Sequence, residues 1–123
     1  MKWIQLAVGG AAGTIARYVL GGVVYQFLGT GFPYGTLVVN LTGCLLIGFL
    51  ATVAEEKFLL GPGARTLLMI GFLGAFTTFS TFILESANLI RDGETLRAFV
   101  NVLASVVLGF AVFRFGVLIG EII

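Results

Sequence analysis

The chain has 123 residues, of which 59% are hydrophobic and only 11% are charged, and its formal net charge at pH 7 is +1. An ordinary soluble domain carries about 25% charged residues, so this composition argues against a soluble class and indicates a protein of the lipid bilayer. The absence of histidine excludes histidine-based metal sites and proton relays, and the chain has no basic stripe that would bind nucleic acid.

Four hydrophobic stretches are long enough to cross a membrane, which takes about 20 largely apolar residues. The breaks between them contain both prolines, Pro33 and Pro62, and the polar turn from Arg91 to Glu94, as is typical of turns. We therefore predict one domain over residues 1–123, an all-α integral membrane fold. Its expected transmembrane helices cover residues 3–28, 35–53, 64–90 and 96–119.

The first helix combines small residues with one charge. Gly9 and Gly13 form a GxxxG pattern, which lets helix backbones approach closely and predicts packing rather than a particular function. Arg17 lies about 21 Å along the helix from Trp3 at 1.5 Å per residue, so we expect its side chain to reach a water-filled vestibule or the far interface. No acidic residue is present in this helix.

Polar residues inside a span are costly, and they are therefore functional candidates. In the second helix the candidates are Asn40, whose amide offers two donors, and Thr42. Cys44 lies in the same helix and is interpreted as a small packing residue. Because it is the only cysteine, it excludes an intrachain disulfide.

The third helix contains the most unusual segment, GFLGAFTTFSTF over residues 71–82. Its glycines and threonines weaken a helix locally, so we predict a break near the centre of this helix. Broken backbone at membrane depth is tolerated only where it is buried in protein or lines a watery cavity. Such a break would expose carbonyl oxygens that can ligate a cation. The alternative is that the hydroxyl groups bond back to their own helix.

Phenylalanines follow the same segment. Phe79 and Phe82 are spaced i, i+3 and are expected on one face, with Phe76 continuing the stripe. Such a stripe ordinarily serves packing, but ring edges are electropositive and can hold a small anion where water is scarce. Glu85 follows one turn later and is the one acidic residue well within a span.

The fourth helix and the distribution of charge bear on assembly. Asn101 and Ser105 lie i, i+4 on one face of this helix.

Four crossings place both termini and the loop between the second and third helices on one side of the membrane. The positive residues are Lys2, Lys57, Arg65 and Arg114 toward that side, and Arg17, Arg91 and Arg97 toward the other.

A positive-charge bias normally sets orientation, and four residues against three set none. We therefore expect insertion in both orientations and an antiparallel, dual-topology homodimer. In that dimer the two central breaks would meet on the two-fold axis, so that each carbonyl is offered twice.

Together these features resemble the CrcB/Fluc fluoride channel family. The similar blocks are GTIARY in the first helix, GTLVVNLTG in the second, GFLGAFTTFSTF in the third, and Glu85 one turn after the last phenylalanine. The resemblance covers essentially the whole chain. It implies a multi-pass, dual-topology homodimer of the inner (plasma) membrane with two fluoride pores, through which cytoplasmic fluoride leaves passively and its toxicity is reduced.

The resemblance also implies roles for individual residues. A structural sodium ion at the dimer centre would be held by the backbone carbonyls of Gly74 and Thr77. The implied fluoride-pore residues are Asn40, Phe79, Ser80, Thr81, Phe82, Asn101 and Ser105, and the vestibule residues are Arg17 and Glu85. The chain departs from the family pattern at Ala75, where relatives have glycine, and at Gly109, where relatives can have a hydroxyl.

Other classes of protein are weighed against this hypothesis. A small dual-topology multidrug/proton antiporter has a similar length, but it needs a membrane-buried carboxylate, typically in the first helix. That helix has Arg17 and no acid, while Glu85 keeps the alternative open. A non-transporting assembly factor would not need the costly polar residues. No pairing of nucleophile and base supports an enzyme.

Overall fold

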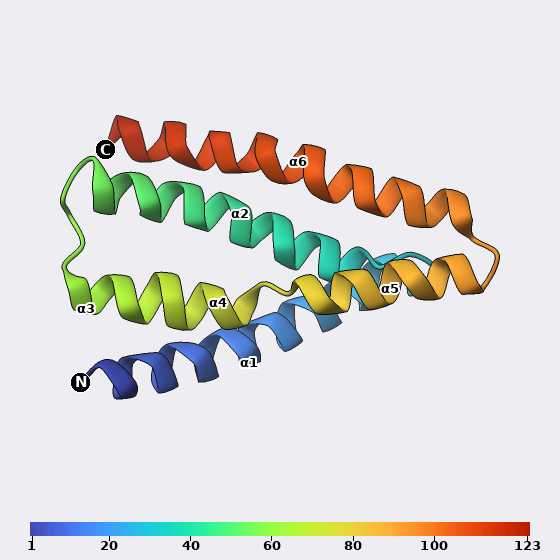
Figure 1. The fold of residues 1–123 in the computed structure, drawn as a ribbon, viewed down its shortest axis with the longest axis horizontal. Helices are drawn as coiled ribbons and strands as arrows, with labels where there is room; N and C mark the ends of the chain where they lie inside the picture. The colour runs from blue at the N-terminus through green and yellow to red at the C-terminus, as the bar shows by residue number, and fades with distance from the viewer.

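The computed structural model describes all 123 residues and consists of four helices long and apolar enough to cross a membrane. These are α1 (Lys2–Leu28), α2 (Tyr34–Glu55), a third span (Pro62–Arg91) and α6 (Thr95–Ile122). Their ends differ from the predicted ends by three residues or fewer. Both termini and the connection between α2 and the third span lie at the same end of the bundle, as four crossings require (Figure 1).

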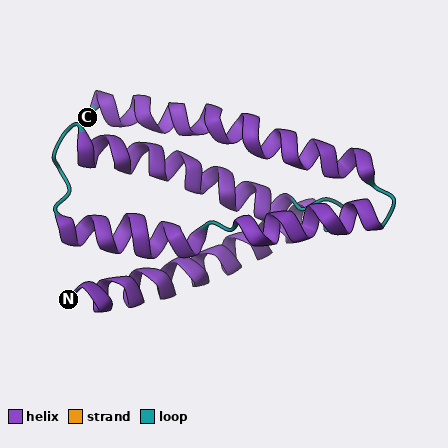
Figure 2. Ribbon diagram, in the orientation of Figure 1, coloured by secondary structure: helices purple, strands orange, loops and turns teal.

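The third span is interrupted near its centre. It consists of α3 (Pro62–Arg65), the π-helical segment η1 (Thr66–Phe72), α4 (Leu73–Phe76) and α5 (Phe79–Arg91). Between α4 and α5 the backbone is extended, with ψ of 156° at Thr77 and 118° at Thr78. Figure 2 shows this stretch as a loop inside the span. The predicted central break is therefore confirmed, whereas the wider π turns before it were not predicted.

Glycines determine how closely the helices pack. An added Cβ at Gly9 or Gly13 of α1 would collide with the backbone of the third span, whereas at Gly10 it would meet nothing within 4 Å. Gly48 of α2 and Gly116 of α6 likewise face the backbone of the opposite helix. This is the close approach that small residues permit in membrane helices.

The subunit has a small interior beside the break. Only 20 of 123 residues are buried, and the core cluster consists of Val39, Leu73 and Phe76. Most large apolar side chains lie on the outside, where lipid tails are as apolar as the side chains themselves. Because the core lies next to Thr77 and Thr78, α1 and α2 can hold the break from one side.

Candidate functional site

Asn40 of α2 pairs with the break through both ends of its amide. Its Nδ2 donates to the carbonyl oxygen of Thr78 at 2.9 Å, and its Oδ1 accepts from the Thr78 N–H at 2.9 Å. These bonds replace the helical partners that Thr78 has lost, as buried backbone polar groups require. One N–H of the Asn40 amide remains after this pairing, because the amide has two donors.

The carbonyl groups of Gly74 and Thr77 are among those that lose their helical donors at the break. In an unbroken helix the N–H of Thr78 would bond Gly74, and the N–H of Thr81 would bond Thr77. Here the Thr78 N–H bonds Asn40, and the Thr81 N–H bonds the Thr78 hydroxyl at 3.3 Å, which caps α5. Gly74 and Thr77 therefore present carbonyl oxygens, and these are the two positions of the predicted sodium site. The ion itself stays a prediction.

The threonine hydroxyls near the break take different roles. The Thr77 hydroxyl donates to the Leu73 carbonyl at 2.9 Å, and the Thr42 hydroxyl donates to Val38 at 2.7 Å. Both bond back to their own helix, which was the alternative considered for this cluster. The Thr78 hydroxyl, by contrast, caps the next helix.

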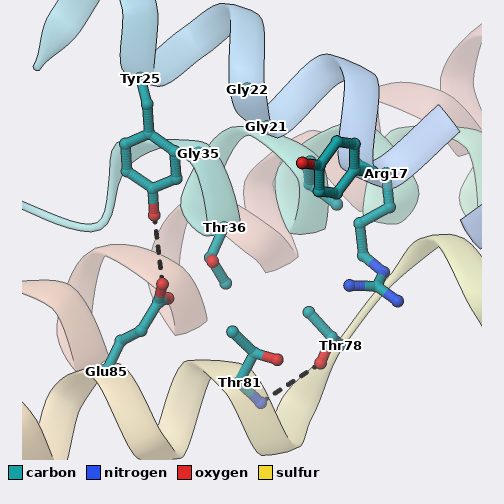
Figure 3. A pocket seen from close by; sticks show the side chains of 11 residues that line it. Arg17, Gly21, Gly22, Tyr25, Gly35, Thr36, Thr78, Thr81 and Glu85 are labelled. Atoms are coloured by element: carbon teal, nitrogen blue, oxygen red, sulfur yellow. Dashed lines mark hydrogen bonds between the residues drawn. The ribbon is translucent and has the colours of Figure 1, made fainter. Parts of the chain in front are cut away.

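Arg17 of α1 also binds the backbone at the break. Its Nε donates to the carbonyl of Ala75 at 3.1 Å, one of the last carbonyls of α4, which have no helical partner. Arg17 also lines a cavity of about 340 Å³, here called the inner cavity (Figure 3). Its other polar lining residues are Tyr18, Tyr25, Thr36, Thr78, Thr81 and Glu85.

Glu85 of α5 points into the inner cavity. Its Oε2 accepts a hydrogen bond from the Tyr25 hydroxyl at 3.2 Å (Figure 3), and its Oε1 is buried without a partner. Tyr25 was not predicted. A signal for it exists, because Arg17, Gly21 and Tyr25 are spaced at four residues along one face of α1, and all three line the inner cavity.

A second cavity, of about 460 Å³, lies beside the break on the side of α6 and is here called the Phe groove. Its lining includes Asn40, Gly74, Thr77, Phe79, Phe82 and Ser105. The rings of Phe79 and Phe82 have centroids 5.9 Å apart at an angle of 51°, so the two rings are neighbours, as predicted. Phe82 is 8% exposed and Phe79 is 74% exposed. The hydroxyl oxygen of Ser105 is buried without a partner.

Some predicted residues lie away from this groove. Asn101 is 1% exposed, and its Nδ2 donates to the Ser86 hydroxyl at 2.9 Å, between α6 and α5. Ser80 is exposed and lines neither cavity, while Thr81 lines only the inner cavity. The prediction that Phe76 continues the phenylalanine stripe is wrong. Phe76 is buried and stacks on Phe72 with centroids 5.6 Å apart. The extended residues Thr77 and Thr78 follow Phe76, so it does not share a helical face with Phe79.

The chain is similar to known proteins over nearly its whole length. Residues 4–117 match the family described as "CrcB-like protein, Camphor Resistance (CrcB)". The chain is 47% identical over 122 residues to the fluoride-specific ion channel FluC of Desulforapulum autotrophicum, covering 99% of this chain and 98% of that protein. A protein of the same name from Geobacter sp. (strain M21) is 51% identical over 104 residues, which cover 85% of this chain and 84% of the relative. Another, from Magnetococcus marinus, is 43% identical over 123 residues, or 100% of both chains.

Proposed function

The chain belongs to the CrcB-like protein family, and we propose that it is a fluoride-selective channel that lets cytoplasmic fluoride leave the cell passively and so reduces fluoride toxicity. It is a multi-pass membrane protein, with four helices of membrane length, and its place is the plasma membrane. The observation that carries the proposal is the Phe groove, where hydrogen-bond donors and aromatic rings meet and no charged residue is part of the lining.

The Phe groove suits a small anion. Fluoride is strongly hydrated, so a selective path must replace lost water with donors. Asn40 keeps one N–H after pairing with Thr78, and the Ser105 hydroxyl has no partner. The electropositive edges of Phe79 and Phe82 add to these donors. No carboxylate lines the groove, so no negatively charged side chain in it repels an anion.

The direction of flow follows from acid–base chemistry. In acidic surroundings fluoride enters the cell as the neutral weak acid, and it is trapped as the anion after the acid dissociates inside. A negative membrane potential drives an anion outward with about 2.3 kcal/mol per 100 mV. Passive conduction is therefore sufficient, and no coupled energy source is required.

We propose further that the working unit is an antiparallel, dual-topology homodimer. Phe79 and Gly74 lie on the exposed side of the break, here called its outer side. Broken backbone is not tolerated against lipid. A second copy in the opposite orientation covers this side and brings two breaks together on a two-fold axis in the membrane plane. The nearly balanced positive charge permits both orientations.

We also propose a structural sodium ion at the dimer centre. Gly74 and Thr77 of each subunit offer carbonyl oxygens without helical donors, and oxygen is the ligand that hard cations prefer. The cation supplies positive charge that offsets the facing carbonyl dipoles. Gly74 leaves room for this arrangement, because a Cβ at that position would meet nothing within 4 Å inside the subunit.

Liposomes that contain only the purified protein test the channel proposal. They are loaded with potassium fluoride or potassium chloride, valinomycin balances the charge, and halide-selective electrodes record the efflux. We expect rapid fluoride efflux, little chloride efflux and no need for a proton gradient. Equal rates for the two halides would contradict the proposal. Transport only under an imposed proton gradient would favour the antiporter alternative instead.

A further inference from the structure

A third cavity adjoins the inner cavity and is here called the outer cavity. It has a volume of about 290 Å³ and is lined by residues 30–33 between α1 and α2 and by Asn88, Leu89 and Asp92 near the end of α5. Only Tyr25 and Glu85 line both cavities. Since these two side chains are hydrogen-bonded to each other (Figure 3), their contact stands at the junction of the two cavities.

An anion that passes the junction meets the carboxylate of Glu85. The inner cavity contains Arg17, whose guanidinium is bonded to the break, and the outer cavity contains Asp92. Glu85 lies between them. Only its Oε2 has a partner, the Tyr25 hydroxyl, and its Oε1 has none. No other hydrogen bond therefore fixes where this carboxylate points.

The ring of Tyr25 packs closely on α2. It packs against α2 at Gly35, where an added Cβ would collide with the ring carbons. Tyr25 and Glu85 belong to two long helices, α1 and α5. A rigid ring can therefore hold the hydroxyl at one position relative to α5.

We propose that Tyr25 is a positioning residue of the ion pathway, whose hydroxyl holds the Glu85 carboxylate aside at the junction of the outer and inner cavities so that an anion can pass. This inference rests on the proposed function, because it assumes that the two cavities form one approach to the break. It predicts that removing the hydroxyl alone moves a negative charge into the passage.

The test uses a thiol in the inner cavity and two reagents of opposite charge. Thr81→Cys in a Cys44→Ala protein is treated with an anionic and a cationic methanethiosulfonate, and the two modification rates are compared. In Tyr25→Phe the ratio of the anionic to the cationic rate should fall about fivefold, the factor that ~1 kcal/mol of Coulomb energy between charges 4 Å apart in water produces. Tyr18→Phe is the matched control, since Tyr18 lines only the inner cavity.

Each outcome decides between positioning and packing. A general loosening of the fold would raise both rates and leave their ratio unchanged, which would overturn the proposal, as would an equal fall in Tyr18→Phe. If Tyr25→Phe is not recovered as folded protein, Glu85→Gln alone replaces it. Removing the charge should raise the ratio, and an unchanged ratio would overturn the proposal. These rates are read without transport, so fluoride efflux of the unmodified protein remains a separate test of the proposed function.

Discussion

On its inner side, which faces α1 and α2, the broken third span is held by side chains of its own subunit. Arg17 donates to the carbonyl of Ala75, and Asn40 pairs with both backbone polar groups of Thr78. On its outer side, a Cβ at Gly74 would meet nothing within 4 Å, and Phe79 is 74% exposed. The subunit thus completes one side of the break and leaves the other side for a second copy.

This contrast shows that residues of one type serve opposite purposes on the two sides. Gly13 is required within the subunit, because α1 packs directly on the backbone of Phe72 at that position. Gly74 has open space within the subunit, so the fold accepts a small side chain there, and only a bulky one would obstruct a second copy. Substitutions on the inner side should therefore damage the fold, and those on the outer side should damage assembly or flux.

The largest effect is expected on the inner side, for Gly13→Leu. The new side chain would overlap the backbone of the third span, and overpacking of this kind costs about 3 kcal/mol or more. We expect no monodisperse protein in size-exclusion chromatography and no fluoride efflux. Gly10→Leu is the control, since a Cβ at Gly10 meets nothing within 4 Å. Normal folding and flux of Gly13→Leu would contradict the claim that the inner side of the break determines the fold.

Forcing a single orientation should abolish function without damaging the inner side. Two or three lysines added beside Lys57 bias insertion through the positive-inside rule, so every copy would face the same way. We expect no efflux from cells that express this variant alone, and recovery when a variant of opposite bias is co-expressed. Full activity of one biased variant by itself would rule out an obligate antiparallel pair.

Removal of sodium should weaken assembly on the outer side. A ligand present at about a hundred times its Kd stabilises the state that binds it by ~2.7 kcal/mol. Replacing sodium with a large organic cation should therefore lower dimer association by about a hundredfold, as measured by single-molecule photobleaching in liposomes. Unchanged association and unchanged fluoride flux would mean that the carbonyls of Gly74 and Thr77 hold no functional cation.

A smaller effect is expected for Phe79→Leu, which should reduce flux while the fold is retained. Apolar swaps of similar size usually cost less than about 1.5 kcal/mol, and this ring is largely exposed. Loss of one ring-edge interaction of ~1.4 kcal/mol should slow fluoride efflux about tenfold. Phe27→Leu is the matched control, because Phe27 is 79% exposed and lines none of the three cavities. Equal fluoride flux in both variants would mean that Phe79 serves packing and does not contact the permeating ion.

Hydropathy and local propensity were sufficient to predict much of this arrangement. The length of the apolar stretches predicted all four spans, and the glycines and threonines between Gly71 and Phe82 predicted the break. Arg17 and Glu85 could be selected because charge inside a span is costly. Each of these predictions depends on a residue and its neighbours in the sequence.

Tertiary features could not be predicted in the same way. The contact between Tyr25 and Glu85 depends on how α1 lies against α5, which no local pattern specifies. Helical spacing also failed across the break, because the extended residues Thr77 and Thr78 separate the phase of Phe76 from that of Phe79. For Asn101, spacing along α6 did not reveal the partner Ser86 on α5.

Cross-linking at Gly74 tests most directly whether a second copy completes the outer side of the break. In a Cys44→Ala protein reconstituted in lipid, Gly74→Cys is oxidised and compared with Gly10→Cys, since a Cβ at either glycine meets nothing within 4 Å. A disulfide requires Cα atoms within about 7 Å of each other, so it reports direct apposition of two copies. We predict a covalent dimer for Gly74→Cys and none for Gly10→Cys. Absence of a cross-link at position 74, or equal cross-linking at both positions, would contradict this account.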